Sequence, residues 1–338
     1  MTIDLGDFPL TGTNLEVDGV ALGYGPRRRV LDAILIEAAI AAGAEFRDGF
    51  SVDDYLMDGA AVTGIRGRSY RTGALITAEA RITIGADGRH SSLANAVDAP
   101  VYETIPSLAC WYFGYWSGVP MDGLEIYRRD RSVVFAFPSS DGLTAVFIGW
   151  EISEFGRVRQ DVAAAFMKVL GQIPMLDQRI RAGTHEERFY GTGDVPNFFR
   201  KPYGPGWALV GDAGNHKDPY MALGISDAFR DAELLASAID HGLCGRQPLA
   251  DALADYEQQR NSAAMQLYHQ NAQLARFGPV PDDELALRAA LQGNQEMTNM
   301  FYLARQGMIP MEEFFNPDNL SPVMARAGAG VMEIGAVL

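Results

Sequence analysis

The stretch GPGWALVGDAGNHKDPYMALGISDAFRDAELLASAI, residues 204–239, decides the fold that we predict for this chain. Its apolar run Trp207–Val210 is short enough for a buried strand, and Gly211-Asp212 follow directly. From Ile225 the apolar residues recur at helical spacing, which predicts a helix. A strand that leads through a glycine-rich loop into a helix places free backbone N–H groups where an anionic or polar ligand can bind. An ordinary structural turn after the strand is the competing interpretation.

The composition of the 338-residue chain is that of a globular protein, with 48% hydrophobic and 21% charged residues and a formal net charge of −15. This charge argues against nucleic acid or an anionic membrane as a partner. Cys110 and Cys244 form no disulfide framework and no metal-like cluster, which favours a reducing, cytoplasmic setting. We expect no membrane span, no signal peptide and no metal site. The sequence does not indicate the oligomeric state.

The N-terminal part imitates a dinucleotide-binding unit. Apolar patterning predicts a helix at Arg27–Ala42, with a strand before it at Val17–Leu22 and a strand after it at Ala44–Arg47. Gly23 and Gly25 match the start of a Gly-x-Gly-x-x-Gly turn, but Arg28 stands at the third glycine position. An arginine there prevents close packing of helix and strand, so we do not predict a true fingerprint.

Strands separated by turn residues follow, and they lead to a second candidate loop. The alternating patterns lie at 50–56, 60–67, 75–80 and 81–84, which we expect to form one sheet. Gly85-Ala86-Asp87-Gly88 then closes the last strand and opens a short helix. Alone, this tetrapeptide is more typical of a turn than of a binding site.

From about residue 100 the chain is rich in aromatic residues. Strands are predicted at 111–116, 123–128, 132–137, 144–150 and 184–190, with a helix at 158–170, and we read them as an antiparallel sheet of hairpins. One face of such a sheet could contact a small-molecule substrate, with Tyr112, Trp116, Phe135 and Phe137 as candidates. Parity cannot choose among them while the register is unknown. Helices are predicted at 250–277 and within 282–306, followed by a loose tail at 325–338.

Two motifs together resemble the FAD-dependent monooxygenases related to para-hydroxybenzoate hydroxylase. Residues 211–236, GDAGNHKDPYMALGISDAFRDAELLA, resemble the second flavin-binding motif of that family, and the Asp87-Gly88 loop resembles its Gly-x-Asp-Gly-x-x-Ser motif. By this resemblance Asp212 binds the ribityl chain of FAD, and Asp87 contacts FAD and helps it to communicate with the nicotinamide donor. The FAD-binding residues that the resemblance implies are Arg28, Asp87, Gly88, Gly211, Asp212, Pro219, Gly224 and Ile225.

Arg28 begins a helix like the arginine-led helix of the family, but it is equally consistent with an ordinary surface arginine. Leu223 departs from the family, which often has Gln before the last glycine. A backbone contact would survive that change, and a side-chain contact would not.

The resemblance implies an α/β fold, namely an FAD-binding Rossmann-like domain with an inserted antiparallel substrate sheet and C-terminal helices. The predicted segments are 1–98 and 201–278 for the FAD-binding domain, 99–200 for the substrate sheet and 279–338 for a helical cap and tail. No Gly-x-Gly-x-x-Gly unit precedes Arg28, so the part that would hold the ADP half of FAD is expected to be incomplete. We therefore expect weak FAD affinity from these residues alone.

The function that the resemblance implies is an FAD-dependent monooxygenase that uses NAD(P)H and hydroxylates a small aromatic or polyketide-like molecule. A flavin-dependent reductase or dehydrogenase, a halogenase-like flavoprotein and a truncated remnant without catalysis stay open as alternatives. The Trp-x-Trp-x-Ile-Pro signature of halogenases is absent, because Trp111 and Trp116 have the wrong spacing. The hard chemistry belongs to the cofactor, so we nominate no catalytic acid or base, although His90 and His216 lie near the motifs.

Overall fold

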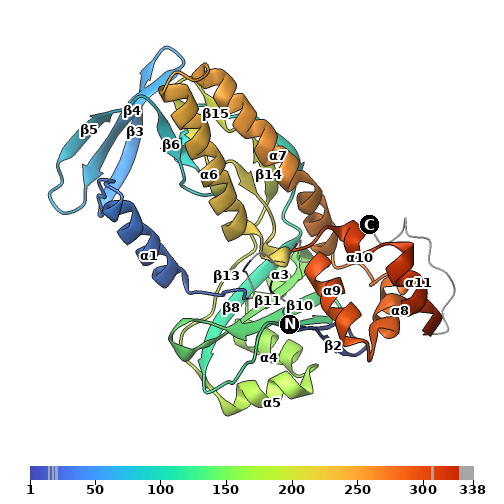
Figure 1. Ribbon diagram of the computed structural model, residues 1–338. Helices are drawn as coiled ribbons and strands as arrows, with labels where there is room; N and C mark the ends of the chain where they lie inside the picture. Colours follow the sequence, from blue (N-terminus) through green and yellow to red (C-terminus); the bar gives the residue numbers. More distant parts are fainter. Residues whose placement is uncertain (14–15, 17–18, 20–21, 306–307, 327–338) are drawn as a thin grey trace. The chain divides into compact units, whose positions relative to one another are not determined.

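The computed structural model describes residues 1–13, 16, 19, 22–305 and 308–326, with side chains to residue 322 (Figure 1). The chain forms two compact units. Unit 1 comprises Met1–Ile34, Trp111–Thr192 and Phe277–Leu338, and unit 2 comprises Leu35–Cys110 and Gly193–Arg276. These boundaries differ from the predicted segments, because the first residues group with the aromatic sheet. The functional division into FAD-binding and substrate segments remains a prediction.

Unit 1 is built on an eight-stranded sheet with the order β12-β8-β11-β10-β9-β1-β2, in which β13 also pairs with β8. The strands are β1 (Thr2–Asp4), β2 (Pro9–Thr11), β8 (Ala109–Ser117), β9 (Glu125–Arg129), β10 (Ser132–Pro138), β11 (Thr144–Glu151), β12 (Thr184–His185) and β13 (Tyr190–Thr192). The hairpins β9–β10 and β10–β11 are antiparallel, which confirms the predicted sheet of hairpins. The single strand predicted at 184–190 is wrong, since β12 and β13 are separate short strands on β8.

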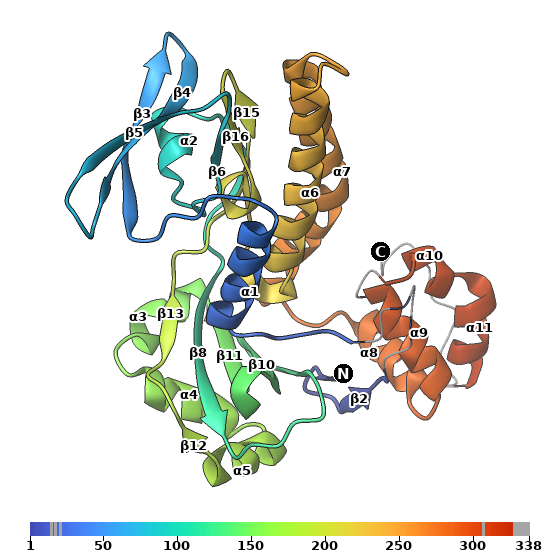
Figure 2. The same ribbon diagram turned by 60° about the vertical axis from the view of Figure 1, so that its left-hand side comes forward.

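Helices cover one face of this sheet. They are α3 (Phe155–Val158), α4 (Val162–Leu170) and α5 (Pro174–Ala182), and Figure 2 shows α4 and α5 close to the sheet. The one helix predicted at 158–170 is therefore two. Asp161 causes the break, because its side chain accepts a hydrogen bond from the N–H of Ala164 at 2.9 Å and so caps α4.

The C-terminal helices of unit 1 share one core with the N-terminal strands. These helices are α8 (Asp282–Leu291), α9 (Gln295–Arg305), α10 (Met311–Phe314) and α11 (Pro317–Arg326). Leu10 packs among Leu287, Phe301 and Phe314 in this core. The buried Arg288 also ties α8 to the N-terminal segment, since it bonds Asp7 at 2.9 Å. Most of the predicted tail lies outside the described residues.

Unit 2 contains three small sheets and a long helix pair. The sheets have the orders β3-β4-β5, β15-β16-β6 and β17-β14-β7. The strands are β3 (Phe50–Asp58), β4 (Ala61–Ser69), β5 (Leu75–Glu79), β6 (Thr83–Gly85), β7 (Val101–Ile105), β14 (Asn197–Arg200), β15 (Tyr203–Gly204), β16 (Trp207–Leu209) and β17 (Asn215–His216). The prediction that residues 81–84 continue the β3-β4-β5 sheet is wrong, because β6 pairs in parallel with β16.

The helices of unit 2 agree with the helical spacing in the sequence. They are α2 (Ser92–Ala96), α6 (Gly224–Leu243) and α7 (Leu249–Leu274), and α6 and α7 lie side by side in both views (Figures 1 and 2). Leu235 of α6 and Tyr256 of α7 pack with Ala208 of β16 in one hydrophobic core. The Tyr256 hydroxyl donates to the carbonyl of Leu209 at 3.0 Å, which fixes α7 to the end of β16.

The N-terminal helix, α1 (Arg28–Ala41), confirms the helix predicted at 27–42 and continues from unit 1 into unit 2. None of its residues is buried. The strand predicted at 44–47 is wrong, because these residues form no strand. The strand predicted at 17–22 falls largely outside the described residues. Within the described part of the chain, no helix has the length and apolar character needed to cross a membrane.

Candidate functional site

Two strands place the predicted loops at one edge of a sheet. β6 and β16 are parallel, with Gly85 opposite Leu209, and the N–H of Val210 donates to the carbonyl of Gly85 at 3.0 Å. The carboxyl ends of parallel strands meet at the same edge, which is where open α/β sheets bind ligands. The loop after β6 carries Asp87, and the loop after β16 carries Asp212. The structure thus brings together two motifs that are more than a hundred residues apart in sequence.

The Asp87 loop is held by the start of α2. The Asp87 carboxylate accepts hydrogen bonds from the N–H and the hydroxyl of Ser92 at 2.7 and 3.0 Å. Burial alone would raise the pKa of Asp87, but hydrogen bonds from Ser91 and Ser92 outweigh it and lower the pKa. Gly88 has φ of +79° and only open space where a Cβ would lie. The loop therefore presents an ionised carboxylate and an accessible backbone.

The Asp212 loop turns sharply as it leaves β16. Gly211 has φ of +58°, a conformation that favours glycine, and it begins a short 3₁₀ turn over Gly211–Ala213. A Cβ on Gly211 would lie 3.4 Å from the Cβ of Ala228, so the loop lies close against α6. Asp212 is exposed, whereas the next residue, Ala213, is fully buried.

The amino end of α6 is open. The helix begins at Gly224 after Leu223, and no side chain caps it. Pro219 lies in the preceding 3₁₀ turn, and Gly224 and Ile225 are both exposed. In the part of the chain that the structure describes, no atom lies within 4 Å of a Cβ built on Gly224. Its φ is not in the left-handed region, so neither backbone geometry nor packing within the chain requires glycine there. Close approach of a ligand would require it.

A buried ionic network supports this helix end from inside. Lys217 forms an ion pair with Asp227, and their side chains are 4% and 11% exposed. Arg230 bonds Asp227 and Asp231 at 2.6 Å each. Burial raises the pKa of Asp231, although Arg230 opposes the shift. The network joins the Asp212–Pro219 segment to the first two turns of α6.

Two arginines that the sequence reasoning missed donate to the backbone of the loops. Arg200 of β14 donates to the carbonyl of Ala213 at 3.0 Å and to that of Arg89 at 3.2 Å. Arg260 of α7, which is fully buried, donates to the carbonyls of Gly214 at 3.3 Å and Arg200 at 3.0 Å. No sequence motif marks these residues, because their partners are backbone atoms far away in the chain.

The histidines near the motifs occupy different settings. His216 is buried, contacts the carbonyl of Pro196, and stacks on Phe198 with a centroid distance of 5.8 Å. Burial lowers the pKa of His216, and the nearby Asp212 partly opposes this shift. His90 is exposed and pairs with Asp194 at 2.9 Å. Among the described residues, no group of three or more His, Cys, Asp or Glu could hold a metal ion.

Arg28 belongs to unit 1, whereas the two motif loops belong to unit 2. Its side chain is 71% exposed and pairs with Asp32 one turn along α1 at 3.0 Å. A pair of this kind contributes little to stability. The role in FAD binding that the resemblance implies remains a prediction for this residue.

The register of the unit 1 sheet separates the aromatic candidates. Tyr112 and Trp116 lie on the face that packs against α4, with ring contacts from Tyr112 to Trp150 at 6.4 Å and from Trp116 to Phe166 at 5.8 Å. Trp116 is only 4% exposed. Trp116 therefore belongs to the core of unit 1, and the half-buried Tyr112 lies on the same face.

Phe135 and Phe137 lie on the other face, which we call the aromatic face. Its half-buried or exposed members are Phe113, Tyr115, Phe135, Phe137, Phe147 and Tyr190. Phe113 stacks on Phe147 at 4.5 Å and on Tyr190 at 5.6 Å, and Phe137 stacks on Phe147 at 5.6 Å. The sequence reasoning missed Phe113 and Phe147, although alternation within 111–116 would have offered them once the register was known.

A polar segment lies beside the aromatic face. A Cβ on Gly25 would meet the Phe137 ring at 2.5 Å, so this glycine allows the chain to cross the ring closely. The Arg27 guanidinium lies 4.5 Å from the centroid of the Tyr115 ring and pairs with Glu187. The face therefore combines flat apolar rings with one charged pair.

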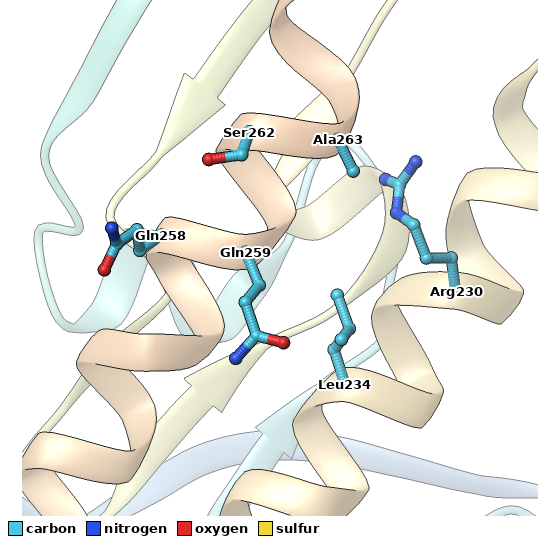
Figure 3. A pocket seen from close by; sticks show the side chains of 6 residues that line it. All are labelled: Arg230, Leu234, Gln258, Gln259, Ser262 and Ala263. Carbon is cyan, nitrogen blue, oxygen red and sulfur yellow. The ribbon is translucent and has the colours of Figure 1, made fainter. Parts of the chain in front are cut away.

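An open groove of about 660 Å³ lies elsewhere in unit 2, between α6 and α7 (Figure 3). Gln258, Gln259, Ser262 and Ala263 of α7 and Arg230 and Leu234 of α6 line it. None of the predicted FAD-binding residues lines this groove.

A family model described as an FAD binding domain matches residues 26–271. The chain belongs to this family. The match covers both motif loops and the helix pair, and it confirms the predicted FAD-binding family and the α/β fold class.

Curated relatives belong to more than one enzyme class. The tryptophan 2-halogenase of Chondromyces crocatus is 24% identical over 242 residues, which are 68% of this chain and 46% of that protein. The digeranylgeranylglycerophospholipid reductase of Methanosarcina mazei is 27% identical over 246 residues, 68% of this chain and 57% of that protein. The chain thus spans about half the length of these relatives.

Solved structures share the fold. A myxobacterial chondrochloren halogenase has a TM-score of 0.74 at 18% identity, covering 99% of this chain and 82% of its own. A probable FAD-dependent monooxygenase from Pseudomonas aeruginosa has a TM-score of 0.58 at 20% identity, covering 80% of this chain and 71% of its own. At such identities the likeness shows the fold alone.

The residues at the sheet edge fit a flavin nucleotide. The open space at Gly88 and Gly224 leaves room for a flat ring and a sugar chain to approach the backbone. The N-terminus of α6 offers N–H donors without a side-chain cap, and the exposed carboxylate of Asp212 could accept hydrogen bonds from sugar-type hydroxyls.

Proposed function

We propose that this protein is an FAD-dependent monooxygenase that is reduced by NAD(P)H and hydroxylates a small aromatic or polyketide-like molecule. The observation that carries the proposal is the parallel pairing of β6 with β16, which sets the Asp87 and Asp212 loops beside each other at one sheet edge. Membership of the FAD-binding family supports the choice of cofactor. The nicotinamide donor, the substrate class and the cytoplasmic setting are parts of the proposal.

Each loop has a binding task in this proposal. Asp212 accepts hydrogen bonds from the ribityl hydroxyls, while Gly211 lets the loop lie close to α6. Pro219, Gly224 and Ile225 line the isoalloxazine ring, and the N–H groups at the start of α6 donate to its polar edge. Asp87 stays ionised through its bonds to Ser92 and contacts the cofactor from the second loop. Bound FAD would supply the electron transfer between NAD(P)H, oxygen and substrate.

The aromatic face of unit 1 is the proposed contact surface for the substrate. Its stacked rings offer flat apolar area to an aromatic or polyketide-like molecule. Phe135 and Phe137 are retained as substrate candidates, and Phe113 and Phe147 join them. Tyr112 and Trp116 stay predicted substrate candidates, but they lie on the opposite face of the sheet, where Tyr112 packs against Trp150 and Trp116 against Phe166 of α4. No residue is proposed as a proton donor or acceptor.

A reductase is the second candidate, because curated relatives include reductases that carry the same part of the fold. A halogenase is a third candidate, because a curated relative is a tryptophan 2-halogenase. Oxygen and halide separate the three classes. A monooxygenase consumes oxygen with NAD(P)H in the presence of substrate, a reductase transfers electrons to substrate without oxygen, and a halogenase requires chloride or bromide.

The first experiment is a visible absorption spectrum of the purified chain with and without added FAD. Perturbed flavin bands would support binding at the two loops, and NAD(P)H consumption would then be followed with and without oxygen and halide. A chain that never perturbs the spectrum of added FAD would contradict the proposed function. That result would favour a non-catalytic remnant.

A further inference from the structure

We propose that Arg200 is a positioning residue that holds the Asp87 loop and the Asp212 loop in one arrangement. The proposal rests on the proposed function, because these loops are the inferred flavin site. One guanidinium group spans both loops, since it donates to the carbonyl of Ala213 and to the carbonyl of Arg89. Each carbonyl belongs to a residue within two positions of the loop aspartate or glycine.

The side chain is held so that it can serve both loops. Arg200 is the last residue of β14, and its backbone N–H donates to the carbonyl of Gly214 at 2.8 Å. Its guanidinium lies 4.4 Å from the centroid of the Phe198 ring, which limits its side-chain freedom. The Arg260 guanidinium donates a hydrogen bond to the Arg200 carbonyl, so α7 anchors the end of β14.

The chemistry of arginine suits this task. A planar guanidinium presents several donors in fixed directions, so a single group can bond carbonyls that lie on opposite sides of it. No carboxylate among the described residues lies within ion-pair distance of Arg200. Burial lowers the pKa of Arg200, and Asp87 partly opposes the shift. Backbone carbonyls are therefore the partners that hold this cation.

The contact is distinct from the parallel pairing of β6 and β16. That pairing ends at Gly85 and Val210, and each loop continues beyond it. Without Arg200, no side chain among the described residues would donate hydrogen bonds both to residues 88–90 and to residues 211–214. Each loop would then have to be ordered when flavin binds, and that ordering would cost affinity.

Arg200→Met removes the donors and keeps an apolar stem over Phe198. The matched control is Arg246→Met, which removes an exposed guanidinium beyond the other end of α6, where Arg246 pairs with Asp240. The first readout needs no flavin, because amide hydrogen exchange of the unliganded protein reports the two loops directly. We expect faster exchange in both loops of Arg200→Met and unchanged exchange in the control.

The second readout is flavin affinity, measured by fluorescence titration with riboflavin, FMN and FAD. A loop-positioning role predicts that Arg200→Met weakens all three by a similar factor, about tenfold, because each flavin must then order both loops on binding. Arg200→Lys keeps the charge but cannot reproduce the planar fork, so it should recover less than half of the loss on a logarithmic scale. This variant also tests the proposal if Arg200→Met does not fold.

Three results would overturn the inference. Exchange that quickens in one loop alone would show that Arg200 does not couple them. Unchanged affinity for every flavin would remove its role in binding. Loss confined to FMN and FAD would indicate a direct contact with phosphate. If the unmodified protein binds none of the three flavins, the proposed function fails as well, so the two failures are distinguishable.

Discussion

The buried pair between Lys217 and Asp227 allows a quantitative prediction for Asp227→Asn. The substitution leaves Lys217, whose side chain is 4% exposed, without its carboxylate partner. Breaking a buried ion pair by removing one partner costs about 3–5 kcal/mol. Lys217→Met should cost less, about 1–2 kcal/mol, because Asp227 keeps Arg230 as a partner and Met fills most of the lysine volume.

Urea unfolding followed by circular dichroism would measure these differences. Asp240→Asn is the matched control, since it removes an exposed carboxylate from the same helix and should leave the unfolding curve unchanged. A larger effect for Asp227→Asn than for Lys217→Met is the specific expectation, because a stranded buried cation is costlier than a carboxylate that keeps a partner. Equal effects for Asp227→Asn and Asp240→Asn would refute the reasoning.

Other predictions concern the ligand side and the two sheet faces. Gly224→Ala should weaken FAD binding by about tenfold or more while raising helix stability by up to about 1 kcal/mol. A flavin titration and thermal unfolding would measure the two effects. Unchanged FAD affinity would contradict this prediction. The folded-state pKa of His216 is depressed, so its contribution to stability is present above about pH 6.5 and is lost as pH falls. A His216→Phe variant should therefore lose less stability between pH 7 and 5, a comparison that urea curves at several pH values can make. Trp116→Ala should destabilise the fold by about 3–5 kcal/mol. Phe137→Ala should raise the KM for an aromatic substrate with a smaller loss of stability. A larger loss of stability for Phe137→Ala than for Trp116→Ala would contradict the assignment of faces.

Local signals predicted the elements that depend on neighbouring residues. The hairpins around β10 and the helices α1, α6 and α7 carry alternation or helical spacing within one short window. The break between α3 and α4 also had a local signal in Asp161, a residue typical of a helix N-cap. The single helix predicted at 158–170 runs across this cap.

Long-range pairing could not be predicted in the same way. β6 has three residues, and its choice of β16 over β5 depends on a partner more than a hundred residues away. The faces of the aromatic sheet required the register of β8, since a slip of one residue exchanges Tyr112 for Phe113. Arg200 carried no signal at all, because backbone carbonyls accept from any donor that the fold brings near.

The two sides of the loop region differ in a way that sequence motifs do not express. On the protein side, charged groups hold the loops: Arg200 and Arg260 bond the loop carbonyls, and Lys217 and Asp227 pair beneath the start of α6. On the outer side, Gly88 and Gly224 leave open space beside the backbone. Ordering the loops in advance reduces the entropy that a ligand must overcome, while an unobstructed backbone lets it approach the free N–H groups. The motif glycines and aspartates therefore explain which ligand could fit, and the arginines and the ionic network explain why the loops are already arranged to receive it.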